Sequence, residues 1–392
     1  MLPNRFCTAF KSVVYLDLSN NRITCVLPNN MSTMQLDALY LSSNQLTGRL
    51  PLLPRLLRKL DLSQNSFSGP LPTEFGAPGI FELILSSNYF TGHITESICE
   101  LHDLLALDLS HNLLEGELPE CFHMQNVSFL FLSNNKLSGK FPPSLQTCPS
   151  LAFLDLAWNK FFGSLPVWIG DLVYLRFLQL SHNKFSGDIP VNITNLKRLR
   201  MLNLASNGIT GTIPPSLSNL PAMAQKHPRR SGINMHLWYT GLIGNFREVL
   251  SVVMKRQELK YGAGIFDMVS IDLSINHLTG RIPSGRQLDT LYTDNPTMYN
   301  GNYDLCGPPL HKNCSINISD IEHGHEKKSV NYSDPMFFYF GLLSGFVVGL
   351  WVVLCALLFK QSWRVSYFRL FDKLCLLIKT PRFSDPRIKP ID

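Results

Sequence analysis

The sequence is poor in charge and lacks the usual marks of a zinc protein. Asp, Glu, Lys and Arg make up 16% of its 392 residues, against about 25% in ordinary soluble domains. So few charges fit a long continuous apolar core together with a membrane segment. The nine cysteines include no paired C-x-x-C motifs, and we interpret them as structural thiols or disulfides.

Signatures of catalysis are also missing. The sequence has no phosphate-cradling glycine loop and no paired catalytic carboxylates, and the 33 residues after Phe359 are too few for a kinase domain. We therefore predict a protein that is not an enzyme, with no cofactor and no metal. The net charge of +6 is concentrated in the C-terminal tail, which argues against a nucleic-acid partner.

The first ten residues, MLPNRFCTAF, lack the apolar run of a secretory signal peptide. They fit the repeat frame described next, so the chain begins inside a coil without a polar cap. We expect a truncated product, a fragmentary gene model or an isoform.

A repeat of 21 to 24 residues organises the chain. Each unit has alternating leucines, an Asn, a Gly four residues later and a Pro after three more, as in LQLSHNKFSGDIP. The Asn recurs at positions 21, 44, 65, 88, 112, 135, 159, 183, 207 and 276. The Gly is missing after Asn21, and Thr95 replaces one Pro. This period and pattern are those of leucine-rich repeats.

The residue types predict how a unit folds. A strand this short cannot bury its leucines alone, so they must face a core shared between coils. The Asn amide can satisfy backbone groups of the turn, coil after coil. Glycine supplies a backbone shape that other residues resist. We predict an α/β repeat fold, a solenoid with a parallel β-sheet on its concave face, plus one transmembrane helix.

An aromatic group occupies the outward strand positions of the later coils. It comprises Phe129, Phe131, Phe153 and Phe177, with Trp158 beside the strand and His182 flanking it. Exposed aromatics on a concave sheet are typical of a binding hot spot, so we treat these residues as a candidate ligand face. The alternative is that the rings only pack on one another between coils.

The repeat frame is interrupted once and then closed. Repeats cover residues 1–220, an insertion covers 221–264, and the last repeat with its cap covers 265–314. The insertion, basic and aromatic, is either a partner-binding loop or a flexible bulge. Cys306 and Cys314 bound a loop whose closure would add about 2–3 kcal/mol. Cys99 and Cys121 lie one coil apart and leave a second bridge open, and Cys148 is expected to be a buried thiol.

Export and membrane anchoring are indicated by the remaining segments. Six N-glycosylation sequons begin at Asn30, Asn126, Asn192, Asn313, Asn317 and Asn331. Residues 315–335 are predicted to be an extracellular stalk. Residues 336–359 carry no charge and are long enough for a transmembrane helix. The basic tail, 360–392, places the repeats outside the cell and the tail in the cytoplasm.

Gly341, Gly345 and Gly349 repeat every four residues within the apolar span. They form a smooth stripe where a second helix can approach closely. The alternative is that glycine is simply common in membrane helices.

The whole chain resembles the plant leucine-rich-repeat receptor-like proteins, kinase-lacking cell-surface receptors that include fungal-elicitor and leaf-mould resistance receptors. The resemblance rests on the repeat with L-x-G-x-I-P, the insertion, the cap GNYDLCG, the glycine-striped span and the tail WRVSYFRLFDKL. In the insertion, Lys255 and Tyr261 match a Lys-x5-Tyr motif of the family. The resemblance implies a single-pass plasma-membrane receptor that binds a peptide or protein ligand, with the insertion and later coils engaging a co-receptor kinase and the stripe engaging an adaptor kinase.

Two departures from the family bear on function. Relatives have a signal peptide, an N-terminal cap and more coils, and they carry about four coils after the insertion where this chain has one. The leading hypothesis is a non-catalytic receptor in plant defence. The alternatives are a developmental peptide receptor, a truncated non-signalling fragment or decoy, and an enzyme-inhibiting repeat module, which the membrane span disfavours.

Overall fold

The computed structural model describes residues 10–120, 125–224, 250–254, 257–261 and 268–314. These residues all fall within the first of two compact units, Met1–Ile316. The predicted stalk, apolar span and tail lie outside the described residues, as do Asn317, Asn331 and the three glycines of the stripe. No helix in the described ranges has the length and apolar character needed to cross a bilayer.

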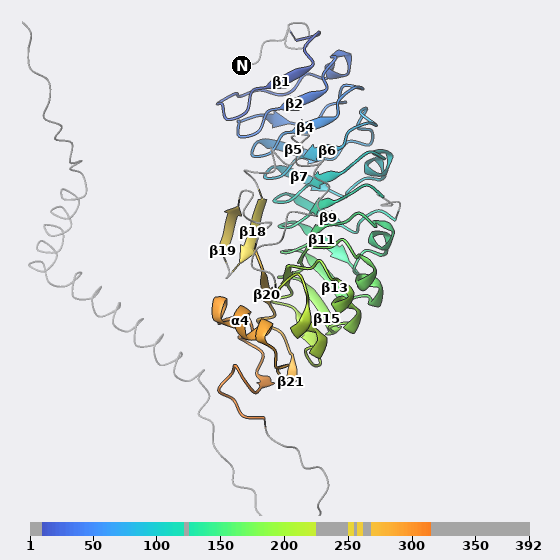
Figure 1. The fold of residues 1–392 in the computed structure, drawn as a ribbon. Coiled ribbons are helices and arrows are strands. Elements are labelled where there is room, and N and C mark those ends of the chain that lie inside the picture. The colour runs from blue at the N-terminus through green and yellow to red at the C-terminus, as the bar shows by residue number, and fades with distance from the viewer. Residues whose placement is uncertain (1–9, 121–124, 225–249, 255–256, 262–267, 315–392) are drawn as a thin grey trace, which may run out of the picture. The chain divides into compact units, whose positions relative to one another are not determined.

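Each repeat contributes one short strand to a ten-stranded parallel sheet (Figure 1). In spatial order the strands are β1 (Tyr15–Asp17), β2 (Ala38–Tyr40), β4 (Lys59–Asp61), β6 (Glu82–Ile84), β8 (Ala106–Asp108), β10 (Phe129–Phe131), β12 (Phe153–Asp155), β14 (Phe177–Gln179), β16 (Met201–Asn203) and β20 (Ser270–Asp272). The middle residue of every strand is a leucine or isoleucine that points into the core. The predicted parallel sheet is therefore confirmed.

A second parallel sheet, which was not predicted, has eight strands that follow the Asn of eight repeats, from Asn44 to Asn207. Its strands are β3 (Thr47–Gly48), β5 (Ser66–Pro70), β7 (Tyr89–Gly92), β9 (Leu113–Gly116), β11 (Lys136–Gly139), β13 (Lys160–Ser164), β15 (Lys184–Asp188) and β17 (Gly208–Thr210). Most contain one buried apolar residue between polar ones, as Phe185 lies between Lys184 and Ser186. So short a pattern ending at a glycine resembles a turn when only the sequence is read.

Six coils also contain a short 3₁₀ helix in the described residues. These helices are η1 (Met31–Thr33), η2 (Glu96–Glu100), η3 (Pro143–Thr147), η4 (Val167–Asp171), η5 (Val191–Asn195) and η6 (Pro215–Asn219). The repeat's Pro directly precedes η4 and η5, as expected because proline tolerates a helix start where its missing N–H is not needed. The described ranges hold one α-helix, α4 (Arg286–Asp294), after the last coil.

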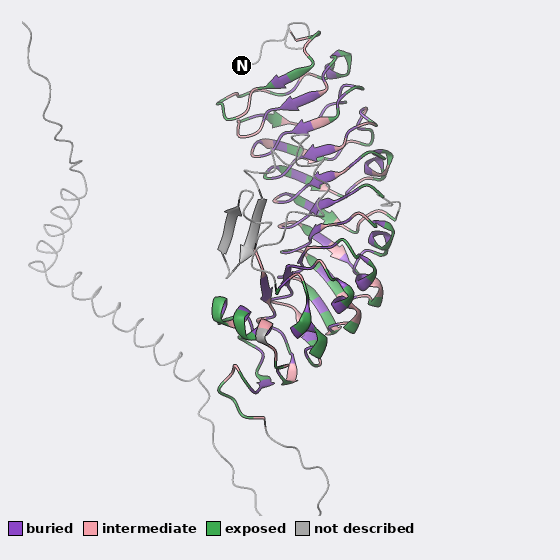
Figure 2. Ribbon diagram, in the orientation of Figure 1, coloured by how far each residue is buried: buried purple, intermediate pink, exposed green. Residues whose placement is uncertain are grey.

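The core is a single apolar column that runs through all coils, seen as purple strands in Figure 2. Beside it, the repeat Asn residues form the predicted ladder. The amide of Asn183 donates to the carbonyl oxygens of Leu156, Leu180 and Ser181 at 2.9, 3.1 and 3.3 Å. Its Oδ1 accepts the N–H of Phe161 at 3.0 Å. Every repeat Asn from Asn44 to Asn276 joins its own coil to the one before in this way.

The solenoid continues across the insertion. Strand β20 pairs directly with β16, with Met201 opposite Ser270, and Asn276 bonds to Leu204 of the coil before it. Within the insertion, β18 (Leu250–Met254) and β19 (Gln257–Tyr261) form an antiparallel hairpin. Residues 225–249, 255–256 and 262–267, which include Lys255, lie outside the described part of the chain.

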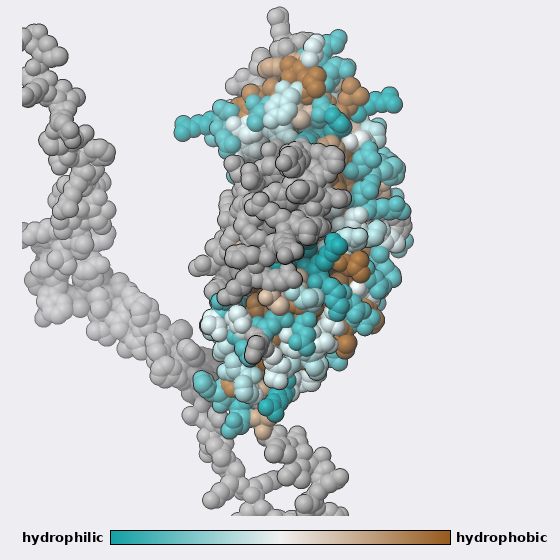
Figure 3. All heavy atoms as spheres, viewed as in Figure 1, coloured by the Kyte–Doolittle hydropathy of each residue, from teal (hydrophilic) through white to brown (hydrophobic). Residues whose placement is uncertain are grey.

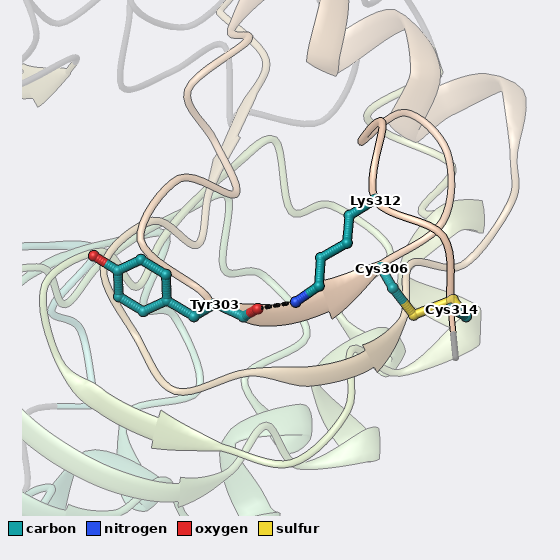
Figure 4. Close-up of a disulfide and its surroundings, with 4 residues drawn as sticks. All are labelled: Tyr303, Cys306, Lys312 and Cys314. Carbon is teal, nitrogen blue, oxygen red and sulfur yellow. Dashed lines mark hydrogen bonds between the residues drawn. A yellow bond between two sulfur atoms is a disulfide. The ribbon is translucent and has the colours of Figure 1, made fainter. Parts of the chain in front are cut away.

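The C-terminal cap contains the predicted disulfide (Figure 4). Cys306 and Cys314 are bonded, and their Cα atoms lie 5.0 Å apart. Strand β22 (Asp304–Cys306) pairs with β21 (Thr279–Arg281) of the last coil, and Lys312 donates a hydrogen bond to the carbonyl oxygen of Tyr303. The bridge therefore fastens Cys314 to β22, which pairs with the final repeat.

The structure tests the prediction for Cys148 in full and the prediction for Cys99 and Cys121 in part. Cys148 is a buried thiol, as predicted, and its Sγ donates to the carbonyl oxygen of Ser144 at 3.7 Å. Cys99 is disulfide-bonded, while Cys121 lies outside the described residues.

Candidate functional site

The outer face of the ten-stranded sheet, opposite the core, carries the first and third residue of each strand. Those two positions flank a leucine or isoleucine that faces inward, because side chains alternate along a strand. In-register pairing of the strands then aligns the outer side chains into two columns. The candidate ligand face predicted above lies on these columns.

The first column contains a phenylalanine ladder on three neighbouring strands. Phe129, Phe153 and Phe177 are cross-strand partners. Their ring centroids lie 4.8 and 4.5 Å apart in stacked pairs, which matches the spacing of about 4.8 Å between strands. Phe153 thus has a neighbouring ring on each of its faces.

The predicted exposure of these phenylalanines is wrong. Phe129, Phe153 and Phe177 are 4%, 3% and 3% exposed, and Phe131 in the second column is 9% exposed. Their direction was predicted correctly, because none belongs to the core cluster. Ring stacking between coils, the alternative interpretation, accounts for part of their burial.

Trp158 is the member of the predicted face that stays exposed, at 42%. It stacks on the half-buried ring of His182 in the next coil, with centroids 3.7 Å apart and planes 9° apart. Both residues precede a repeat Asn and have a φ of 55°, in the left-handed region. Their shared backbone conformation aligns the two rings at the edge of the sheet.

Buried acids form a second feature of the outer face, which the sequence analysis missed. Asp61 and Asp108 occupy the second column, and burial raises the pKa of both above the ordinary value. Each carboxylate accepts hydrogen bonds from the N–H and hydroxyl of the serine two residues later, Ser63 or Ser110. These bonds lower the pKa again in part, and they explain the recurring Asp-Leu-Ser pattern.

Glu82 differs from these aspartates because neither carboxylate oxygen has a hydrogen-bond partner among the described residues. The residue is 1% exposed. Burial raises its pKa to about 7, Asp61 contributes in the same direction, and Lys59 on the adjacent strand opposes the shift. The one available signal in the sequence is an acid at a position held elsewhere by Tyr, Ala, Lys, Phe, Met or Ser.

The other predicted site residues that the structure describes belong to other elements. Asn30, Asn126 and Asn313 are exposed, and Asn192 in η5 is half-buried. Tyr261 is the last residue of β19 and pairs with Leu250. The described surface seen in Figure 3 is mainly hydrophilic with separate apolar patches.

Comparison with known families agrees with the repeat architecture. The family described as "Leucine Rich Repeat" matches residues 12–34, 56–77, 103–124, 126–148, 174–196 and 198–220. All of these segments lie before the insertion, and each spans about one coil.

Two curated plant proteins are similar to part of the chain. "Receptor-like protein EIX2" of Solanum lycopersicum is 34% identical over 97 residues, which is 23% of this chain and 9% of that protein. "Receptor like protein 21" of Arabidopsis thaliana is 35% identical over 91 residues, 22% of this chain and 9% of that protein. The matched segments thus span about a tenth of the relatives' length.

Solved structures share the fold. The "Plant peptide hormone receptor RGFR1 in complex with RGF2" has a TM-score of 0.53 and 25% identity, covering 71% of this chain and 42% of that one. A "plant ice-binding protein" has a TM-score of 0.57 and 25% identity, covering 77% and 84%. The same solenoid therefore serves different functions. The chain contains leucine-rich repeats, and the curated proteins that it matches over part of its length are plant receptor-like proteins.

Proposed function

We propose that this protein is a non-catalytic cell-surface receptor whose repeats bind a peptide or protein ligand and which signals through partner receptor kinases in plant defence. The observation that carries the proposal is the likeness of the described solenoid to a plant peptide hormone receptor solved with its hormone. The similarity to two receptor-like proteins supports the same class.

The proposed ligand contact is the edge of the ten-stranded sheet at Trp158 and His182. Trp158 is exposed and held rigidly, because it is stacked on the neighbouring ring and its backbone is fixed by the Asn ladder. Rigid, partly exposed tryptophan is the residue type most enriched in binding hot spots. Replacing Trp158 with Ser, the type at this position in three other coils, keeps the backbone compatible and removes the ring.

Membrane anchoring and kinase coupling belong to the same proposal. The uncharged span 336–359 and the basic tail support a single-pass plasma-membrane protein with glycosylated extracellular repeats. Within the span, Gly341, Gly345 and Gly349 would let an adaptor kinase helix approach closely. Lys255 and Tyr261 in the insertion are the proposed co-receptor kinase contact.

Changing all three stripe glycines to leucine tests the kinase coupling. We expect Gly341→Leu, Gly345→Leu, Gly349→Leu to reach the membrane normally, since leucine is more lipophilic than glycine, yet to recover much less adaptor kinase on pull-down. The matched control is Met336→Leu, Phe340→Leu, Val347→Leu, three leucine substitutions at positions that a helix places on the face opposite the stripe. Equal kinase recovery by both variants at equal surface levels would refute coupling through the stripe.

A further inference from the structure

Three successive coils place a lysine at the same exposed position of the eight-stranded sheet. Lys136, Lys160 and Lys184 each follow a repeat Asn and open β11, β13 and β15. The Asn is tied to two coils through the ladder, so the backbone that presents each lysine is fixed. All three side chains are exposed.

An exposed phenylalanine lies among these lysines. Phe162 is 45% exposed, while its neighbour Phe161 is fully buried in the core. Lys160 and Phe162 therefore point to the same side of β13, about 7 Å apart along the strand. Phe162 is also the cross-strand partner of Lys184, at about 5 Å. The ring thus has a cation on its own strand and another on the next.

The charge of this cluster is largely uncompensated. Among the described residues the one ion pair joins Arg58 to Asp37, so none of the three lysines is paired within that part of the chain. Glu115 is the cross-strand partner of Lys136 but forms no ion pair with it in the structure. Asp188, at the far end of β15, accepts a hydrogen bond from Thr210 at 3.1 Å.

Apolar side chains occupy the equivalent repeat position in the two preceding coils, although the strand register places Glu115, not Leu113, opposite Lys136. Tyr89 and Leu113 hold the position equivalent to the lysines and are 57% and 38% exposed. We define the Lys–Phe face as Tyr89, Leu113, Lys136, Lys160, Phe162 and Lys184. It has an apolar part, a cationic part and one aromatic ring inside the cationic part.

We propose that the Lys–Phe face is a docking surface for an acidic peptide segment that carries a large apolar side chain. Carboxylates of the segment would complement the lysine row, and the apolar side chain would pack on Phe162. Aromatic anchors rimmed by charge are the usual composition of a binding centre. A uniformly anionic polymer would gain nothing from Tyr89, Leu113 or Phe162, which is why we favour a peptide over an acidic polysaccharide.

This inference is separate from the proposed receptor function, because it requires neither a membrane nor a kinase. Its probe is a short fluorescent peptide of glutamates with two central leucines, and an all-glutamate peptide is the comparison. Binding to the full chain is followed by fluorescence anisotropy at low and high salt. We expect saturable binding that weakens as salt screens the charges.

A charge-reversed variant tests the lysine row. Lys136→Glu, Lys160→Glu, Lys184→Glu should bind the leucine-containing peptide about tenfold more weakly or worse. The matched control, Lys11→Glu, Arg55→Glu, Lys197→Glu, changes the net charge equally and should bind as the unaltered protein does. Equal loss in both variants would mean a general charge effect and would overturn the proposal.

A second variant tests the contribution of the Phe162 ring alone. It still tests the proposal if the charge-reversed variant fails to fold. Phe162→Ser introduces the residue found at this position in neighbouring coils, Ser138 and Ser186. It should weaken binding of the leucine-containing peptide and leave the all-glutamate peptide unaffected. Competition by oligogalacturonate as strong as by the peptide, or no effect of Phe162→Ser, would show a nonspecific polyanion surface and reject peptide docking.

Discussion

Some positions of the repeat require a particular residue for the coil to fold, and at other positions the side chain can vary. The residue before each Asn has a φ of 54–57° in all ten coils, although it is Ile275 in one coil and Trp158 in another. Left-handed backbone is unfavourable for such residues. The backbone bonds and Asn amides around them hold it in place. The backbone conformation at this position is thus held by its neighbours, so the type of side chain can vary.

Glu82 is a residue whose side chain works against stability at neutral pH. Its pKa in the folded chain is about 7, raised from 4.5 by burial. A raised carboxyl pKa means that the folded state holds the proton more tightly. Stability from this group is fully present below about pH 4.5 and is lost as pH rises through 7, by about 3 kcal/mol.

We therefore expect Glu82→Gln to raise the unfolding midpoint in denaturant at pH 8 and to change it little at pH 4.5. The amide keeps the shape of the acid but carries no charge to desolvate. Glu74→Gln, at an exposed carboxyl, is the control and should show no such pH difference. Identical shifts for Glu82→Gln at both pH values would contradict the assigned cause.

At the scale of the element, neighbouring coils pack closely at two of the 3₁₀ helices. Gly170 lies in η4, and a Cβ there would be 2.2 Å from the carbonyl oxygen of Asn192 in η5. The contact is with backbone, which cannot rotate away. Gly79 offers the opposite case, because its nearest neighbour would be the Asp103 side chain at 3.9 Å.

These two glycines make a matched pair for measurement. Gly170→Ala should destabilise the protein by about 1–3 kcal/mol, the usual cost of overpacking. Gly79→Ala should be neutral or stabilise by a few tenths of a kcal/mol, because it restricts the unfolded chain. The measurement is the free energy of unfolding of both variants in denaturant. A smaller loss of stability for Gly170→Ala than for Gly79→Ala would refute the steric explanation.

Elements also show how far the sequence could predict this structure. Leucine alternation and the phased Asn predicted the ten-stranded sheet and the amide ladder, since both depend on contacts within one repeat or with its immediate neighbour. The eight-stranded sheet was missed because Lys-Phe-Ser-Gly carries too short a signal. Burial of Phe129 or Glu82 depends on what packs over the outer face, and no local pattern records that.

For the solenoid as a whole, each coil is stabilised by the coils beside it, so the last coil depends on its cap. Beyond β21 the chain provides β22 and the loop from Cys306 to Cys314. The buried residues Leu305 and Tyr299 connect that cap to the common core. Loss of the cap should therefore destabilise the nearest coil most, and the destabilisation should decrease with distance along the solenoid.

Cys314→Ser tests this coupling. Without the bridge the unfolded loop regains conformational freedom, which lowers the stability of the cap by about 2–3 kcal/mol on a chain-entropy estimate. Hydrogen exchange should quicken in β22 and β21, less in β20, and hardly at all in β14, because neighbouring coils support each other in series. His311→Gln, three residues away and exposed, is the control for local disturbance. Uniform quickening across all strands would instead show that the described solenoid unfolds as one cooperative unit, and no quickening would show that β22 is held by its strand pairing and its buried leucine alone.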